Sequence, residues 1–402
     1  MKILFLLTQD LESPSGLGRY WPLARALAAR GHKVRIAALH SNWELLSERK
    51  FEREGVYVEY VAPMHVIKTG SQKQYYPAAR LMGVVIRATY ALCRATLSST
   101  VDIIHVGKPH PMNSMAGYLA TRLKGSVLCV DCDDYEAGSN RFAADWQRTV
   151  IALFEKTLPR HARLVTTNTL NMKSKLISWG CKAERIFYLS NGIDRQRFTP
   201  PDPIETSCLR TQLGLDGKRV VLYMGSLSLP SHPVDLLLQS FVQVIQKYPD
   251  TALLLVGGGE DYQVLIDQAH SLGISKAIHF TGRVLPADVH KYYALSDVSV
   301  DPVRDDEACR GRSPLKLFES WVCGVPFVTS PVGDRAHLLG QPPAGILAQP
   351  AGDPQSLANS IMLILGSKEL AQQLRSRGLE EVEQYTWEYL AAKLEQVYLE
   401  LR

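Results

Sequence analysis

Short apolar runs alternate with amphipathic segments along the whole chain. The amphipathic segments place apolar residues at helical spacing, as in Trp21–Arg30, which Gly31 closes, and in Leu236–Lys247. The apolar runs predict strands at Lys2–Thr8, Val34–Leu39, Val56–Val61, Ile103–Val106, Val127–Val130, Leu164–Thr167, Val220–Met224, Ala252–Val256, Ala277–Phe280, Val298–Val300 and Val325–Thr329. Apolar strands that alternate with helices form parallel sheets covered on both faces, so the pattern predicts an α/β protein.

The alternation occurs twice, and a proline-rich segment without periodicity separates the two halves. This segment, FTPPDPIET (Phe198–Thr206), is typical of a linker. We therefore predict a first Rossmann-like domain over 1–197, a linker over 198–206, a second Rossmann-like domain over 207–384 and an amphipathic final helix over 385–402. Two doubly wound halves are expected to face each other across a cleft at the carboxyl ends of their strands.

Composition places the chain among ordinary globular proteins. It has 402 residues, of which 46% are hydrophobic and 21% are charged, and this balance excludes a disordered protein. The net charge of +5 suits an anionic substrate or a membrane surface but does not indicate a nucleic-acid partner. The seven scattered cysteines favour reduced thiols. With no signal peptide and no apolar run long enough for a transmembrane helix, we expect a cytoplasmic location, either free or at the inner face of the membrane.

The stretch GRSPLKLFESWVCGVPF (residues 311–327) carries the strongest candidate chemistry. Its apolar positions predict a helix that Ser313 caps and Gly324 ends. Arg312 and Lys316 lie at the start of this helix, where the helix dipole disfavours cations unless an anion lies between them and the N-terminus. Glu319 follows one turn later, where it can accept a hydrogen bond from a sugar hydroxyl. The alternative is an ordinary amphipathic helix between two strands.

The segment SPLKLFESWVCGVPFVTS resembles the donor site of retaining glycosyltransferases of family 4, which have the GT-B fold. Glu319 matches the second Glu of that family's Glu-x7-Glu pattern, and Lys316 matches the lysine of a subset with a Ser-Pro-Leu-Lys start. Gly324 and Pro326 match the Gly-x-Pro that follows. The first Glu is absent, because Gly311 occupies its position.

The resemblance implies transfer of a sugar from a nucleotide-sugar donor to a hydroxyl acceptor, either a glycan or a lipid-linked molecule, without a bound metal or other cofactor. Glu319 would bind the ribose, while Arg312, Lys316 and backbone N–H groups near Leu315 would stabilise the departing diphosphate. Two other classes stay open: a GT-B protein that binds a nucleotide-sugar or glycan without turnover, and a sugar-nucleotide epimerase. The sequence does not identify the base, the sugar or the acceptor.

Further segments resemble the same family with lower specificity. They are SGLGRYWPLARALAARGHKV with Gly16 and Gly18, LSNGIDRQRF with Asn191, VGGGEDY with Gly258, and HFTGRV with Arg283. The resemblance implies that these glycines and Arg283 border the donor. For Asn191 and Gly258 the alternatives are a plain Asn-Gly turn and tight strand-to-helix packing.

Two departures from the family pattern affect the predicted donor site. The Arg and Lys that usually follow the first strand of the second domain are replaced by Ser226 and, nearby, His232. Either Arg312 and Lys316 take over their role, which we favour, or the site is degraded. For the missing first Glu, the acidic residues 305–307 either supply a carboxylate or form a solvated loop.

In the first domain, a strand is followed by three carboxylates, Asp131, Asp133 and Asp134, where many relatives carry a histidine. Because loops at strand ends form sites, these carboxylates can position the acceptor or act as its base. The alternative is capping of the next helix by Asp133 or Asp134. His105 ends the neighbouring strand and is either a packed residue or part of the acceptor site.

A basic stripe is predicted over Gln72–Ser99. Lys73, Arg80, Arg87 and Arg94 recur every seven residues and would share one face of a helix with apolar flanks. A basic amphipathic helix suits a membrane surface. The alternative is a helix packed on the sheet with one solvated face.

Overall fold

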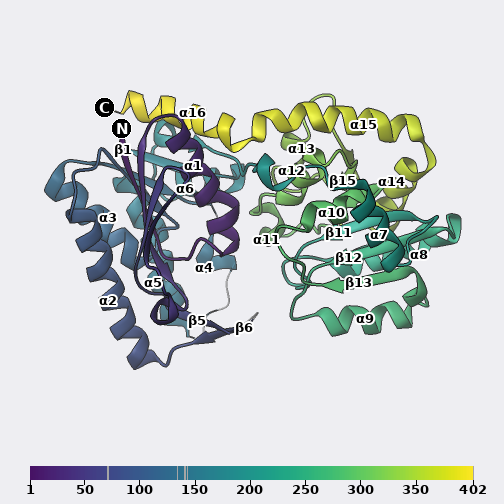
Figure 1. Cartoon of the computed structure of the whole chain (residues 1–402), viewed down its shortest axis with the longest axis horizontal. Helices are drawn as coiled ribbons and strands as arrows, with labels where there is room; N and C mark the ends of the chain where they lie inside the picture. The colour runs from purple at the N-terminus through teal and green to yellow at the C-terminus, as the bar shows by residue number, and fades with distance from the viewer. Residues whose placement is uncertain (70–71, 134, 140–141, 143, 402) are drawn as a thin grey trace. The chain divides into compact units, whose positions relative to one another are not determined.

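The computed structural model describes residues 1–401 apart from 70–71, 134, 140–141 and 143. The chain forms two compact units, one of Met1–Gly192 with Trp387–Arg402 and one of Ile193–Thr386. Figure 1 follows the chain through both units by colour. Each unit is built on a mainly parallel sheet, so the predicted α/β class with two Rossmann-like domains is confirmed.

The first unit has an eight-stranded sheet in the order β10-β9-β8-β7-β1-β2-β4-β3. Its strands are parallel except β3, which pairs antiparallel with β4 at the edge. The strand bounds are β1 (Lys2–Leu7), β2 (Lys33–His40), β3 (Lys50–Arg53), β4 (Val56–Pro63), β7 (Ile103–Gly107), β8 (Val127–Asp131), β9 (Leu164–Thr167) and β10 (Ile186–Tyr188). The sequence pattern did not predict the short edge strands β3 and β10.

Helices cover both faces of this sheet. Their bounds are α1 (Trp21–Ala29), α2 (Ala78–Leu97), α3 (Pro111–Lys124), α4 (Glu136–Ser139), α5 (Asp145–His161), α6 (Leu170–Ser178) and α16 (Trp387–Glu400). One core joins Ile3 and Phe5 of β1 to Leu27 of α1 and Leu394 of α16. The opposite core joins β1 to α2, α3, α5 and α6, and α2 and α3 lie side by side in Figure 1.

The helix predicted over Gln72–Ser99 is wrong in its first part. A hairpin of β5 (Val66–Thr69) and β6 (Gln72–Tyr75) occupies that part, and α2 begins only at Ala78. Pro77 lies at the N-cap with ψ 149°, outside the helical region. Because a proline disfavours helix in the residue before it, the helix does not extend back through Tyr76. Lys73 therefore lies on β6, while Arg80, Arg87 and Arg94 lie on α2.

The second unit has a six-stranded parallel sheet in the order β13-β12-β11-β14-β15-β16. The strand bounds are β11 (Arg219–Met224), β12 (Thr251–Val256), β13 (Ile278–Gly282), β14 (Val298–Val300), β15 (Phe327–Thr329) and β16 (Ile346–Leu347). The helix bounds are α7 (Pro203–Gln212), α8 (Val234–Lys247), α9 (Tyr262–Ser271), α10 (Val289–Ala294), α11 (Glu307–Arg310), α12 (Leu315–Val322), α13 (Arg335–Leu338), α14 (Pro354–Gly366) and α15 (Lys368–Glu381).

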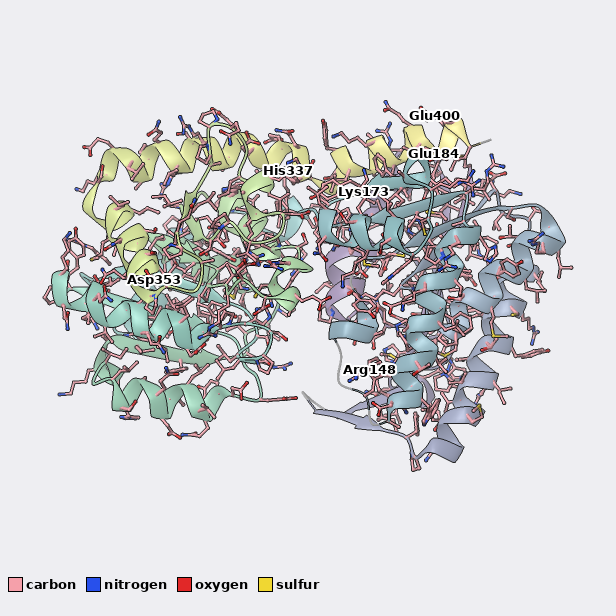
Figure 2. The ribbon with its side chains drawn as sticks, turned by 180° about the vertical axis from the view of Figure 1, so that it is seen from behind. Arg148, Lys173, Glu184, His337, Asp353 and Glu400 are labelled. Atoms are coloured by element: carbon pink, nitrogen blue, oxygen red, sulfur yellow. The ribbon has the colours of Figure 1, made fainter. Side chains whose placement is uncertain are left out.

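Side-chain caps fix where several of these helices begin. Asp353, labelled in Figure 2 at the start of α14, accepts a hydrogen bond of 2.8 Å from the Ser356 N–H. Asp202 accepts one of 2.7 Å from the Ile204 N–H and begins α7. Helix α7 therefore begins inside the segment that the sequence pattern assigned to a linker.

Candidate functional site

In the second unit, the loops after β11 and β12 cross in direct backbone contact. A Cβ on Gly257 would lie 1.8 Å from the Gly225 carbonyl oxygen, and one on Gly259 would lie 2.1 Å from the Leu227 carbonyl oxygen. The Leu227 N–H donates to the Gly258 carbonyl at 3.2 Å. Glycine is therefore required at 257 and 259 by packing between two loops, not by the strand-to-helix packing considered as the alternative for this segment.

Two predicted donor residues meet beside this crossing. A Cβ on Gly258 would lie 2.9 Å from Cγ of Arg283, so the arginine stem lies against the glycine. Arg283 is exposed, and among the described residues no carboxylate forms an ion pair with it. Ser226 is also exposed, and its carbonyl accepts a hydrogen bond of 2.7 Å from the Tyr223 hydroxyl. The hydroxyl of Tyr223 thus holds the loop that follows β11.

Helix α12 begins one residue later than the predicted cap implies. Pro314 occupies the N-cap and α12 starts at Leu315, which is exposed. Ser313 is buried, and its Oγ has no hydrogen-bond partner among the residues that the structure describes, so the prediction that Ser313 caps the helix is wrong. The first N–H groups of α12 have no side-chain cap. A buried hydroxyl and uncapped N–H groups thus lie together at the start of this helix.

Lys316, in the first turn of α12, belongs to a buried ion network. Its Nζ donates to Oδ1 of Asp301 at 3.0 Å and lies 5.0 Å from the centre of the Tyr223 ring. The other oxygen of Asp301 accepts from Nε of Arg335 at 3.0 Å and from its Nη2 at 2.9 Å. Burial alone would raise the pKa of Asp301, but Lys316 and Arg335 outweigh it and hold that pKa far below its usual range.

Arg312 and His232 lie in the same region. Nη1 of Arg312 donates to the carbonyl of Ser231, so Arg312 is tied to the residue next to His232. Burial, with the charges of Lys316 and Arg312, lowers the pKa of His232 to about 2. His232 is therefore neutral at pH 7, and the charge of this region comes from Arg312 and Lys316.

Glu319 lies one turn after Lys316 and is half-buried. Its Oε2 accepts a hydrogen bond of 3.0 Å from the hydroxyl of Tyr293, which is fully buried on α10. Burial raises the pKa of Glu319, while this hydrogen bond and the charge of Arg197 oppose the rise. Tyr293 therefore holds one carboxylate oxygen of Glu319 in place.

The acidic residues 305–307 follow the solvated-loop alternative. Asp305 is exposed and pairs with Arg310 at 2.7 Å, and Asp306 caps α11 by accepting from the Cys309 N–H at 2.8 Å. Glu307 is exposed in the first turn of α11. These interactions account for the acidic loop without a sugar.

In the first unit, Gly16 and Gly18 lie in a π-helical turn (Gly16–Tyr20) that leads into α1. A Cβ on Gly16 would lie 2.2 Å from the Asp10 carbonyl oxygen and 2.7 Å from Cα of Leu11. The backbone at Gly16 is therefore packed against its own loop, and this contact explains the glycine without a ligand.

Asp131, predicted to contact the acceptor, is saturated by protein donors. Arg19 donates to both carboxylate oxygens at 2.8 and 2.7 Å, Tyr20 donates at 3.0 Å and Thr166 at 2.6 Å. Arg19 also donates to Oδ1 of Asn191 at 3.0 Å. All five residues are buried, so Asp131 and Asn191 belong to an internal hydrogen-bond network, and this geometry does not support the acceptor role predicted for Asp131.

His105 is fully buried inside the first unit. Its ring stacks on Phe5 at 4.7 Å, and Nδ1 shares a hydrogen bond with the hydroxyl of Tyr398 on α16. Burial lowers the pKa of His105 to about 4. His105 is a neutral packed residue, as in the alternative considered for it.

Asp133 belongs to a second buried ion network, at the ends of β7 and β8. Nζ of Lys108 lies 3.5 Å from the Asp133 carboxylate and donates to Glu136 at 2.6 Å, and all three side chains are nearly buried. Glu155 of α5 caps α4 by accepting from the N–H groups of Glu136 and Ala137 at 2.7 and 3.1 Å. The structure therefore does not support the prediction that Asp133 acts as the acceptor's base. Asp134 lies outside the described residues.

Sequence reasoning missed three residues that hold the candidate donor site of the second unit, which are Tyr293, Asp301 and Arg335. One signal was available for Asp301. It follows the apolar strand Val298–Val300 directly, just as Asp131 closes the apolar run of β8. An acidic residue at the carboxyl end of a buried strand indicates an internal cation or a ligand.

Neither a metal cluster nor a membrane-spanning helix occurs in the part of the chain that the structure describes. No three His, Cys, Asp or Glu side chains there come together as metal ligands. No helix among the described residues combines the length and apolar character that crossing a bilayer requires.

Solved structures define the class of fold. The chain superposes over its full length on sucrose-phosphate synthase from Thermosynechococcus elongatus, with a TM-score of 0.76, 20% identity and 98% of that chain covered. Anabaena HepE in complex with UDP-glucose superposes over all of both chains with a TM-score of 0.73 and 21% identity. The fold is therefore GT-B.

Sequence comparisons define the family. Residues 15–192 match the glycosyl transferase 4-like domain, and residues 218–367 match glycosyl transferases group 1. The chain therefore belongs to the glycosyltransferases that combine these two domains.

Curated relatives are distant. A GDP-mannose-dependent alpha-(1-6)-phosphatidylinositol monomannoside mannosyltransferase of Mycolicibacterium smegmatis is 26% identical over 58% of this chain and 59% of its own length. Spore coat protein SA of Bacillus subtilis is 28% identical over 47% of this chain and 51% of its own length. The chain thus spans between half and three fifths of the length of these two relatives. A D-inositol 3-phosphate glycosyltransferase of Jonesia denitrificans is 23% identical over 94% of this chain and 88% of its own length.

Proposed function

We propose that this protein is a retaining glycosyltransferase that moves a sugar from a nucleoside-diphosphate sugar to a hydroxyl acceptor. The observation that carries the proposal is an excess of positive charge at the start of α12. Lys316 and Arg335 share the single carboxylate of Asp301, and Arg312 adds a third cation beside them. Such a surplus suits a ligand with two or more negative charges, which describes a diphosphate.

In this proposal, different residues of the site bind different parts of the donor. Glu319, held through one oxygen by Tyr293, accepts from the ribose hydroxyls. Lys316, Arg312 and the N–H groups near Leu315 receive the departing diphosphate. The family's usual Arg and Lys are replaced in this chain by Ser226 and His232, which supply no charge at pH 7. We assign the role of those two cations to Arg312 and Lys316. In this proposal, side chains and backbone N–H groups stabilise the negative charge of the leaving group, and no metal ion is required.

Retention is proposed to proceed by attack from the face on which the diphosphate leaves. The bond from the anomeric carbon to the diphosphate oxygen breaks, and the bond from that carbon to the acceptor oxygen forms. The acceptor's proton passes to the leaving phosphate. No enzyme base is invoked, because Asp131 and Asp133 are each paired with a cation inside the first unit.

The test is nucleotide release from UDP-, GDP- and ADP-sugars with a lipid-rich cell extract as the acceptor source. The named relatives and neighbours include a GDP-mannose-dependent enzyme and a UDP-glucose complex, so UDP- and GDP-sugars come first. We expect release from one donor, with the anomeric configuration retained in the product. Nucleotide binding without release would support the binding protein instead. Conversion of the sugar nucleotide to an epimer, with no nucleotide released and no acceptor required, would support the epimerase.

We further propose that α2 contacts a membrane that carries a lipid-linked acceptor. Met82, Ile86 and Tyr90 recur one turn apart and are 53%, 63% and 68% exposed. Arg87 and Arg94 are exposed on the same helix, and Arg87 stacks on Trp43 at 4.8 Å. Apolar side chains beside cations suit an anionic lipid surface.

Replacing Ile86 by aspartate should therefore weaken binding to vesicles that contain anionic phospholipid by roughly tenfold, because an apolar anchor becomes an anion. Co-sedimentation measures the bound fraction, and neutral vesicles should bind the parent protein less. The matched control is Leu363→Asp, which changes a leucine of α14 that is 57% exposed. Equal sedimentation of the parent protein and Ile86→Asp would rule out this contact.

A further inference from the structure

The network around Asp301 contains more positive than negative charge. One carboxylate, 1% exposed, is shared by Lys316 at 3.0 Å and by Arg335 at 2.9 Å. Uncompensated charge is costly to bury, so a pair of one cation and one carboxylate would serve stability alone better. The additional buried cation therefore requires a different explanation.

Arg335 cannot contact a ligand itself. Its side chain is fully buried, and its Nε and Nη2 are used by Asp301. Nη1 donates to the carbonyl oxygens of Cys309 and Val332 at 3.0 and 3.1 Å. Any effect of Arg335 on a ligand must therefore pass through Asp301.

Lys316 is the member of the network that lies beside the strand-end loops. A Cβ on Gly225, the residue after β11, would lie 2.9 Å from Cε and 3.3 Å from Nζ of Lys316. Asp301 is fixed in turn, because its N–H donates to the Val328 carbonyl and its own carbonyl accepts from Thr329 Oγ1 at 3.0 Å. The ammonium group is thus held between a rigid carboxylate and the backbone at Gly225.

We propose that Asp301 and Arg335 are positioning residues that hold Lys316 at the diphosphate of the donor and keep its charge available. Alone, Asp301 would neutralise Lys316 and weaken its attraction for an anion. Because Arg335 takes one carboxylate oxygen in a two-pronged hydrogen bond, the negative charge is shared, and Lys316 keeps affinity for phosphate oxygens. This inference rests on the proposed function, since it assigns the same site to a nucleoside diphosphate.

The test is a double-mutant cycle on nucleotide binding, which needs no turnover. UDP, GDP and ADP are titrated separately into the full-length protein by calorimetry, and the tightest binder is used for Lys316→Met, Arg335→Gln and the double variant. We expect Lys316→Met to weaken binding roughly ten- to a hundredfold and Arg335→Gln about tenfold. In the Lys316→Met background, Arg335→Gln should have no further effect, because its influence passes through Lys316.

Several outcomes would overturn the inference. If the parent protein binds a nucleoside diphosphate but Arg335→Gln binds it equally well, positioning fails while the proposed function stands. Additive losses in the double variant would show that Arg335 acts independently of Lys316. Absence of binding by the parent protein would overturn the proposed function itself.

Two controls separate positioning from folding. Arg219→Gln removes an Arg–Asp pair of 3.2 Å at the opposite end of β11 and should leave nucleotide affinity unchanged. Arg335→Lys keeps the positive charge but lacks the planar guanidinium group. Its nucleotide affinity should lie between that of the parent protein and that of Arg335→Gln. If Arg335→Gln does not fold, as judged by thermal unfolding, the same cycle is run with Arg335→Lys and the same non-additivity is required.

Discussion

Replacing Glu319 by alanine should lower kcat/KM for nucleotide release by roughly a hundredfold to ten-thousandfold. Each hydrogen bond to a charged group contributes about 1.5–3 kcal/mol, and a carboxylate that accepts from two ribose hydroxyls loses both. Initial rates with the best donor measure the effect. The loss should exceed any change in thermal stability, because Glu319 is half-buried and, among the described residues, its carboxylate accepts a hydrogen bond only from Tyr293.

Two variants show whether this loss is specific. Tyr293→Phe leaves the carboxylate in place and removes its positioning donor, so we expect about a tenfold decrease in kcat/KM. Glu380→Ala, on the exposed face of α15, should be unchanged. Parent-like release by Glu319→Ala would remove this helix from the donor site and with it the main assignment of the proposed function.

Replacing Asp131 by alanine should destabilise the first unit by about 3–5 kcal/mol, because Arg19 would remain buried without its carboxylate. The pair is 3% and 1% exposed, and Tyr20 and Thr166 would also lose their acceptor. Denaturant unfolding followed by tryptophan fluorescence measures this unit selectively. Five of the six tryptophans belong to it, since only the one at position 321 lies in the second unit.

The matched control for Asp131 is an exposed pair of the same unit. Lys50→Met breaks the 2.8 Å contact with Glu59 at a side chain that is 62% exposed and should cost less than about 1 kcal/mol. An Arg19→Met/Asp131→Ala double variant should be more stable than the Asp131→Ala variant, since no buried charge is left unpaired. A destabilisation by Asp131→Ala no larger than that of Lys50→Met would show that the network is not structural.

Acid unfolding gives an independent measure of the same pair. Burial alone would raise the pKa of Asp131, but Arg19 outweighs it and lowers that pKa to about 2, from an ordinary value of 3.8. Since the folded pKa is the lower one, this stabilisation is present above about pH 4 and is lost as the pH falls towards 2. It amounts to about 2–3 kcal/mol. Asp131→Asn should remove this part of the acid dependence.

The two units use the same device at the carboxyl ends of their strands, with different consequences. Asp131 receives one cation and two hydroxyl groups, so its network is balanced and closed. Asp301 receives two cations, so its network keeps an excess of positive charge. The closed network explains stability, whereas the open one is where we place the donor's diphosphate.

Much of the fold was predictable from local patterns. Residues 3–7 of the predicted strand at 2–8 and all residues of the strand at 252–256 are apolar, and in the structure they are fully buried in strands with a neighbour on each side. A strand that is buried on both faces is apolar at nearly every position, so the parallel sheets could be inferred from the sequence without knowledge of the tertiary contacts. The prediction of helix over residues 72–77 was wrong because it relied on the seven-residue spacing of the basic residues and gave too little weight to Pro77, which disfavours helix in the residue before it.

From local spacing alone, the candidate site was predictable only where its residues share one helix. Lys316 and Glu319 were found together because they lie one turn apart on α12. Asp301 and Arg335 of this site are 34 positions apart, so no local spacing connects them. The same holds for Arg19 and Asp131 of the structural network in the first unit, which are 112 apart. The sequence by itself determined the alternation of strands and helices and the basic start of α12, because those depend on neighbouring residues. Only the tertiary structure decided which carboxylates were already satisfied and which cation was in excess, because hydrogen bonding and burial depend on residues that meet through folding.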